Sequence, residues 1–243
     1  MWLLPLKFYC ASKRTIIFTK IYCRILFTIS ANSEGIEMSE NAKLDALILE
    51  NIGDIEASIA RAVEHLDVLL WEEMASSAET VLKQHDWLGA YDGADEDISF
   101  APREWHSEDE DADAQFFFSI DEIPGPDGDS PYTWVAEALA SNPQGASLGL
   151  YFSQDVLTPK RKIDRVFNEN SELIQQIQDC GFVFQDRKIY IPFRLIAEDL
   201  TKAYAEEDFI TALLPLTFAI SKALENRQSF DELVKAFREA AEN

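Results

Sequence analysis

The sequence has few of the residues from which catalytic and metal sites are commonly built. It contains three histidines and three cysteines in 243 residues. Cys10, Cys23 and Cys180 form no CxxC pair, which argues against a disulfide framework and against a zinc site. The histidines are scattered, and no nucleophile-elbow, Walker or dinucleotide-binding glycine pattern occurs. We therefore expect a protein of a reducing, cytoplasmic compartment that needs no cofactor or bound metal, and a non-enzymatic role is favoured.

Positive charge is also scarce. Lys and Arg number 21 against 44 Asp and Glu, which gives a net charge of −23. Because residues 1–37 carry +3, residues 38–243 carry −26. A body this acidic repels nucleic acid and anionic membranes and attracts basic surfaces. The composition therefore predicts a basic protein partner, with no direct binding of nucleic acid and no membrane association.

Long apolar runs are missing from the basic N-terminal segment. Its apolar stretches are shorter than the ~20 residues that a spanning helix needs. Its charges are also in the wrong order for a signal peptide. Composition switches abruptly at Met38-Ser39-Glu40 to that of an acidic soluble protein. We interpret residues 1–37 as an N-terminal extension outside the core, with a targeting segment as the first alternative and an integral part of the fold as the second. Residues 38–243 are interpreted as a single acidic α+β domain.

Apolar residues recur at steps of three and four from Leu44 to Val81. This spacing predicts a long amphipathic helix. We expect it to pack along a sheet, and the alternative is an exposed helix that pairs two copies in a homodimer.

Alternating apolar residues then indicate strands at 98–100, 116–120 and 148–152. A hairpin is expected over 182–191, and residues 197–243 are expected to be helical. The order favours an α+β fold: a mostly antiparallel sheet of about five strands, with a long N-terminal helix and a helical C-terminal tail. Five residues should share the core: Phe116, Phe118, Leu150, Phe184 and Ile191.

The acidic residues are most concentrated in residues 86–137, which hold 16 Asp and Glu and one Arg. Five of the acids fall within six positions: Glu108, Asp109, Glu110, Asp111 and Asp113. Inhibitors, immunity proteins and DNA-mimic proteins use such charge to steer a basic partner into contact. We predict a protein of this type that binds its partner through these five residues, at least during encounter. The alternative within this class is charge that serves solubility alone.

A metal-dependent hydrolase or nuclease-like domain is the alternative from another class. Asp186-Arg187-Lys188 has the acid-x-Lys spelling of the PD-(D/E)xK nucleases, with Asp164 or Asp179 as a possible upstream acid. Asp186 and Lys188 would then be the catalytic residues. The spelling is short and falls on the predicted hairpin turn, so turn chemistry is the better account of it.

Overall fold

The computed structural model describes residues 38–92, 97–106, 114–125, 132–141 and 145–242. Contacts divide the chain into two units, residues 1–60 and 61–243. The described part of the first unit is helical, with α2 at Met38–Glu50 and α3 beginning at Ile52 and ending at Arg61. Several apolar side chains of these helices are exposed: Leu44, Leu47, Ile48, Leu49 and Ile52.

The prediction of one long helix from Leu44 to Val81 is corrected by the structure. The α-helical conformation is interrupted at Asn51 and again by the π-helix η1 (Ala62–Leu66), after which α4 runs over Asp67–Leu82. The Asn51 side chain donates a 2.8 Å hydrogen bond to the Leu47 carbonyl, and such local bonds compete with the helical ladder. A π-helical turn contains one residue more than an α-helical turn, and the spacing of apolar residues in the sequence does not distinguish the two.

The sheet belongs to the second unit and has six strands rather than the five predicted. They are β1 (Trp87–Asp92), β2 (Asp97–Pro102), β3 (Phe116–Ile123), β4 (Ser147–Gln154), β5 (Val183–Gln185) and β6 (Lys188–Phe193). The spatial order is β1-β2-β3-β4-β6-β5, and every neighbouring pair is antiparallel. The predicted hairpin is confirmed as β5 and β6.

The additional strand, β1, contains Gly89 where a strand pattern would have a side chain. A Cβ at Gly89 would lie 2.6 Å from the Tyr91 ring and 2.6 Å from the Ser99 carbonyl oxygen. The Tyr91 ring therefore covers the glycine backbone, which explains why this strand lacks the usual alternation.

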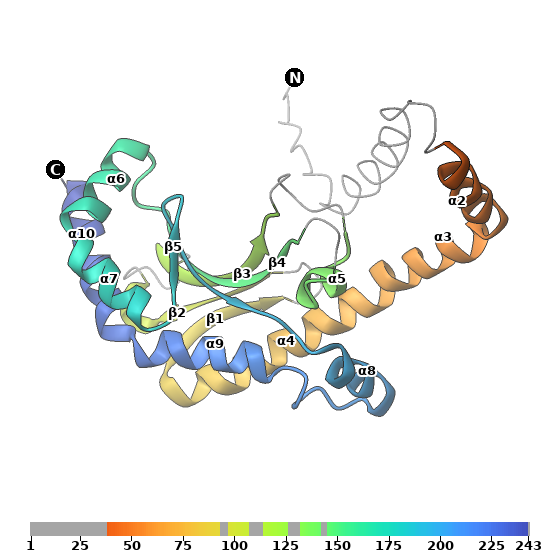
Figure 1. Ribbon diagram of the computed structural model, residues 1–243. Helices are drawn as coiled ribbons and strands as arrows, with labels where there is room; N and C mark the ends of the chain where they lie inside the picture. The colour runs from red at the N-terminus through yellow and green to blue at the C-terminus, as the bar shows by residue number, and fades with distance from the viewer. Residues whose placement is uncertain (1–37, 93–96, 107–113, 126–131, 142–144, 243) are drawn as a thin grey trace, which may run out of the picture. The chain divides into compact units, whose positions relative to one another are not determined.

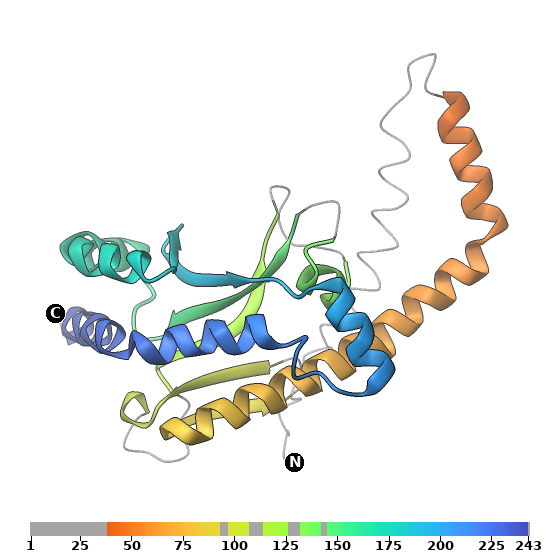
Figure 2. The same ribbon diagram turned by 60° about the horizontal axis from the view of Figure 1, so that its bottom comes forward.

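One face of the sheet is aromatic and fully covered. Phe100, Phe118, Phe152 and Ile189 lie side by side across four strands. Helices α4, α9 (Leu214–Glu225) and α10 (Arg227–Glu242) lie against this face (Figures 1 and 2). Phe230 of α10 packs edge to face on Phe118, with the ring centroids 4.9 Å apart. The predicted core is confirmed: Phe116, Phe118, Leu150 and Ile191 are buried, and Phe184 packs against them partly buried.

Four shorter helices complete the second unit. They are α5 (Trp134–Ala138), α6 (Lys160–Glu169), α7 (Ser171–Asp179) and α8 (Ala197–Glu206). The carboxylate of Asp67, only 3% exposed, accepts hydrogen bonds from the backbone N–H groups of Trp134 (3.2 Å) and Val135 (2.9 Å). A side chain of α4 thus satisfies the free N–H groups at the start of α5, because a helix N-terminus favours negative charge.

Among the residues that the structure describes, no helix has both the length and the apolar character needed to cross a bilayer.

Candidate partner-binding site

The predicted partner-binding residues, Glu108, Asp109, Glu110, Asp111 and Asp113, lie outside the described residues. The chain on either side of them is held firmly. Trp105 before the run is 2% exposed and Phe116 after it is fully buried. The Gln115 carbonyl also accepts a 3.0 Å hydrogen bond from the Asp155 N–H. Both flanks of the acidic run therefore belong to the folded core.

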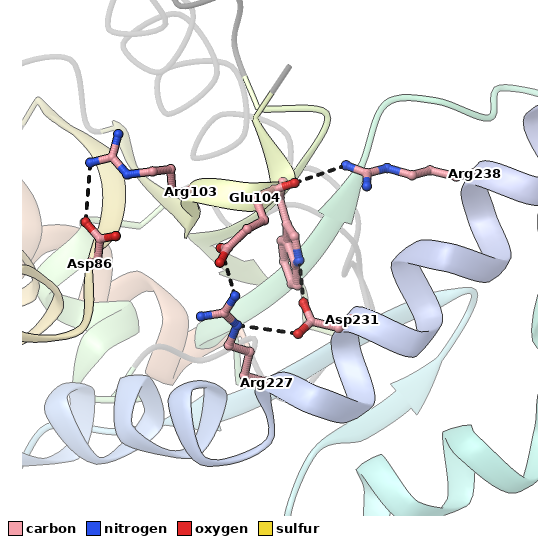
Figure 3. Close-up of polar contacts among 7 residues, drawn as sticks. Asp86, Arg103, Glu104, Arg227, Asp231 and Arg238 are labelled. Atoms are coloured by element: carbon pink, nitrogen blue, oxygen red, sulfur yellow. Dashed lines mark hydrogen bonds and ion pairs between the residues drawn. The ribbon is translucent and has the colours of Figure 1, made fainter. Parts of the chain in front are cut away.

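The preceding flank is attached to the C-terminal helix by a polar network (Figure 3). The indole Nε1 of Trp105 donates a 2.7 Å hydrogen bond to Oδ1 of Asp231 on α10. Arg227, one turn earlier on the helix, lies 2.8 Å from Oε2 of Glu104 and 3.4 Å from Oδ2 of Asp231. The 3₁₀ turn η3 (Arg103–Trp105) is thus fixed to α10 through two neighbouring residues.

Arg238 contacts both flanks. Its Nη2 donates a 3.4 Å hydrogen bond to the Glu104 carbonyl, as Figure 3 shows. Its guanidinium carbon lies 5.5 Å from the centroid of the Phe116 ring, a cation–π distance. One side chain of α10 therefore touches the residues that lead into and out of the acidic run.

The cations around these flanks already have partners within the described part of the chain. Arg103 lies 3.3 Å from Asp86, and Lys235 lies 3.9 Å from Glu239. The hydrogen bond from Arg227 is the largest cause of a lowered pKa at Glu104. Glu104, Arg227, Lys235 and Arg238 line a cavity of about 310 Å³ beside α10. Arg227 and Lys235 are held in ion pairs, whereas Arg238 contacts a carbonyl oxygen and an aromatic ring.

His106 is the last described residue before the acidic run. Its Nε2 is buried, with no hydrogen-bond partner in the portion of the chain described. Burial, followed by the charge of Arg103, lowers the pKa of His106 below its usual range. The described surroundings of His106 therefore favour its neutral form.

The residues of the hydrolase alternative lie on the β5–β6 hairpin. Asp186 and Arg187 both have positive φ, 51° and 67°, between the paired Gln185 and Lys188. This is a two-residue hairpin turn with both central residues left-handed, the type whose twist matches the flanking strands.

Asp164 and Asp179, the possible upstream acids, have other partners. Nε of Arg187 lies 2.6 Å from Oδ1 of Asp164, and Gln175 donates to Asp179 at 2.9 Å. Among described residues there is no group of three or more His, Cys, Asp or Glu side chains that could hold a metal ion. The structure therefore brings Asp164 near the turn but adds no third ligand from the described residues.

A second cavity, of about 370 Å³, is lined by residues of both faces of the sheet, among them Tyr151 and Lys188 from the face opposite the aromatic one. The rings of Tyr151 and Tyr190 stack here with centroids 5.0 Å apart, and Nζ of Lys188 lies 5.4 Å from the Tyr151 ring. The Tyr151 hydroxyl donates to the Glu122 carbonyl at 3.1 Å. Burial, with a smaller contribution from Asp121, raises the pKa of Tyr151, so its hydroxyl stays protonated. The cavity wall therefore offers aromatic surface and no ionised tyrosine.

Sequence reasoning did not find Trp105, Arg227, Asp231 or Arg238. Arg227 and Asp231 are four residues apart on a helix, which is a recognisable pairing signal. Their contacts with η3 join segments more than 120 residues apart, and no local pattern in the sequence indicates these contacts.

Comparison of the chain with protein-family models, curated proteins and solved structures finds no match.

Proposed function

We propose that this protein is a non-enzymatic interaction protein of the inhibitor, immunity or DNA-mimic type. It binds a basic protein partner, and Glu108, Asp109, Glu110, Asp111 and Asp113 attract that partner during encounter. Opposite charges steer diffusional encounter and can raise association rates by orders of magnitude at low salt.

The observation that carries the proposal is the double contact of Arg238. It touches Glu104 before the acidic run and Phe116 after it. One side chain therefore attaches both described ends of the acidic run to the folded core. Charge that is attached to the core at both ends favours a binding role over a role in solubility alone.

The charge balance supports the same proposal. Three described cations beside the flanks, Arg103, Arg227 and Lys235, are engaged with acids of their own and are poorly placed to neutralise the acidic run. Arg238 contacts a carbonyl oxygen and an aromatic ring, and its single charge leaves most of the field of the five acids for a foreign basic surface.

The test compares association rates of two variants with the same change in charge. In the first, the five acids of the run are replaced by Asn and Gln. In the matched control, five exposed acids elsewhere are neutralised: Asp45, Glu50, Asp54, Glu56 and Glu64. The partner is captured from native lysate on immobilised wild-type protein, purified, and measured by stopped-flow mixing at several salt concentrations.

We expect the first variant to associate much more slowly than the control at low salt. The difference should fade as the screening length falls to about 10 Å near 0.1 M salt. If both variants associate at the same rate, the run has no special role and net charge alone attracts the partner. If no basic protein is captured, the proposal is wrong.

The hydrolase alternative stays a prediction, with its own test. Asn is well suited to the left-handed turn position of Asp186, so Asp186→Asn should leave stability unchanged or slightly raised. A divalent-metal-dependent hydrolytic activity that this substitution abolishes would support the alternative and contradict the non-enzymatic proposal.

A further inference from the structure

Helices α2 and α3 share one apolar side, which we call the α2–α3 face. The Asn51 N–H bonds to the Leu47 carbonyl at 3.2 Å, and the Ile55 N–H bonds to the Asn51 carbonyl at 3.0 Å. The helical repeat therefore continues across the interruption at Asn51, and side chains at helical spacing stay on one side. The α2–α3 face consists of six such residues: Leu44, Leu47, Ile48, Ile52, Ile55 and Ile59.

No described residue covers the α2–α3 face. Its first four residues are 39% to 57% exposed, and the last two are partly exposed. None of the residues of α3 is buried, and residues 41–50 of α2 are all exposed. Helices of 13 and 10 residues are marginal in water on their own, since most helical stability comes from packing of the apolar face. The α2–α3 face therefore needs a cover.

Acidic residues border the α2–α3 face. By helical spacing, Asp45 and Glu56 lie along one edge, and Glu50 and Asp54 lie toward the other. All four are exposed, and none forms an ion pair with another residue in the described part of the chain. Lys43 is the one base among residues 41–60. The chemistry of the surface therefore fits a cover that is both apolar and basic.

Residues 13–29 have this chemistry. They include four bases, Lys13, Arg14, Lys20 and Arg24, and no acid, and ten of the 17 residues are apolar. Residues 30–37 connect them to α2 and reach about 26 Å when extended. Leu44 lies only about 9 Å along the helix from Met38, so this connection is long enough. Contacts also group residues 1–60 as one unit.

We propose that residues 13–29 fold back antiparallel onto the α2–α3 face. Their apolar side chains cover the six apolar residues, and their bases pair with the bordering acids. Because the cover belongs to the same chain, its effective concentration at the face is of millimolar order. The proposal does not depend on the basic partner proposed above, since it uses a different surface.

Hydrogen–deuterium exchange, measured by mass spectrometry of peptides from the full-length chain, tests the proposal. Deleting residues 1–37 should raise the exchange rates of residues 41–60 at least about tenfold and leave those of residues 61–243 unchanged. Ile48→Asp, which places a charge in the α2–α3 face, should have the same effect. Leu49→Asp is the matched control, since Leu49 is 71% exposed and lies off the face.

Cys23 allows the contact to be located. In a chain with Cys10→Ser and Cys180→Ser, mild oxidation should join Cys23 within one chain to Ile48→Cys or Ile52→Cys on the α2–α3 face. A disulfide requires Cα atoms within about 7 Å of each other. Ala57→Cys is the control, because Ala57 is exposed on the opposite side of α3.

Rapid exchange of residues 41–60 in the full-length chain overturns the proposal, because the α2–α3 face would then be open to a separate partner. Protection that survives the deletion and increases with protein concentration also overturns it, since a second copy would then be the cover. A disulfide that forms as readily with Ala57→Cys as with the two face variants contradicts the antiparallel arrangement.

Discussion

Trp105 and Asp231 are 126 residues apart in the chain, and their side chains share a 2.7 Å hydrogen bond. This bond joins the end of β2 to α10 beside the start of the acidic run. Replacing Trp105 with Phe keeps an aromatic ring in the core and removes the donor. We expect the free energy of unfolding to fall by about 1.5 kcal/mol, as for hydrogen bonds to charged groups.

Urea unfolding followed by tryptophan fluorescence and far-ultraviolet circular dichroism measures this loss. Asp231→Asn is the control, since it keeps an acceptor oxygen for the indole, and its effect should be smaller. Equal stability of Trp105→Phe and wild type would show that the bond contributes nothing.

The pKa of Glu104 is lowered chiefly by the hydrogen bond from Arg227. A lowered folded pKa means that the ionised carboxylate stabilises the protein above the ordinary pKa of Glu, and this stabilisation is lost as pH falls through the folded value. The stability difference between wild type and Glu104→Gln should be constant at neutral pH and vanish below pH ~4. Because the pair is partly exposed, the difference should be less than about 1 kcal/mol.

Unfolding by urea at a series of pH values checks the prediction, and the difference should shrink in high salt. A stability gap that widens on acidification would contradict the ion pair.

Phe118 is fully buried and packs against several rings: Trp87, Phe100, Trp105, Phe152 and Phe230. Phe118→Ala should reduce the free energy of unfolding by about 3 to 5 kcal/mol, because it removes contacts and leaves a cavity. The adjacent Phe117 is partly exposed on the opposite face, so Phe117→Ala should cost clearly less. Similar losses for both would mean that the two faces of β3 are equally packed.

Deleting residues 1–37 should leave residues 61–243 folded, because the sheet and the helices that cover it all lie in the second unit. Differential scanning calorimetry should give a thermal midpoint close to that of the full chain. Loss of the cooperative transition would show that the N-terminal segment is needed for the core.

The elements that the sequence predicted well are those whose two faces differ strongly. In β3, buried Phe116, Phe118 and Ile120 alternate with residues of the other face, and that alternation alone locates the strand and its inward side. The β5–β6 hairpin was equally predictable, because polar turn residues separate two apolar runs.

What escaped prediction depends on contacts between distant segments. Asp67 is buried because α5, 67 residues later in the chain, presents two N–H groups to it. The contacts of Arg238 with both flanks of the acidic run likewise join residues that are far apart in the sequence. In each case the partner is set by the tertiary fold, so neither composition nor periodicity could identify it.

The position of α9 and α10 after all six strands in the sequence has a consequence for biosynthesis. Strands β1 to β6 leave the ribosome before the helices that bury Phe118 and Phe152 are made. Until residues 214–242 emerge, the part of the aromatic face that α9 and α10 cover is exposed on the nascent sheet, the kind of surface that chaperones bind and that aggregates when translation stops early. Chains that end before Arg227 should therefore be poorly soluble despite their high negative charge.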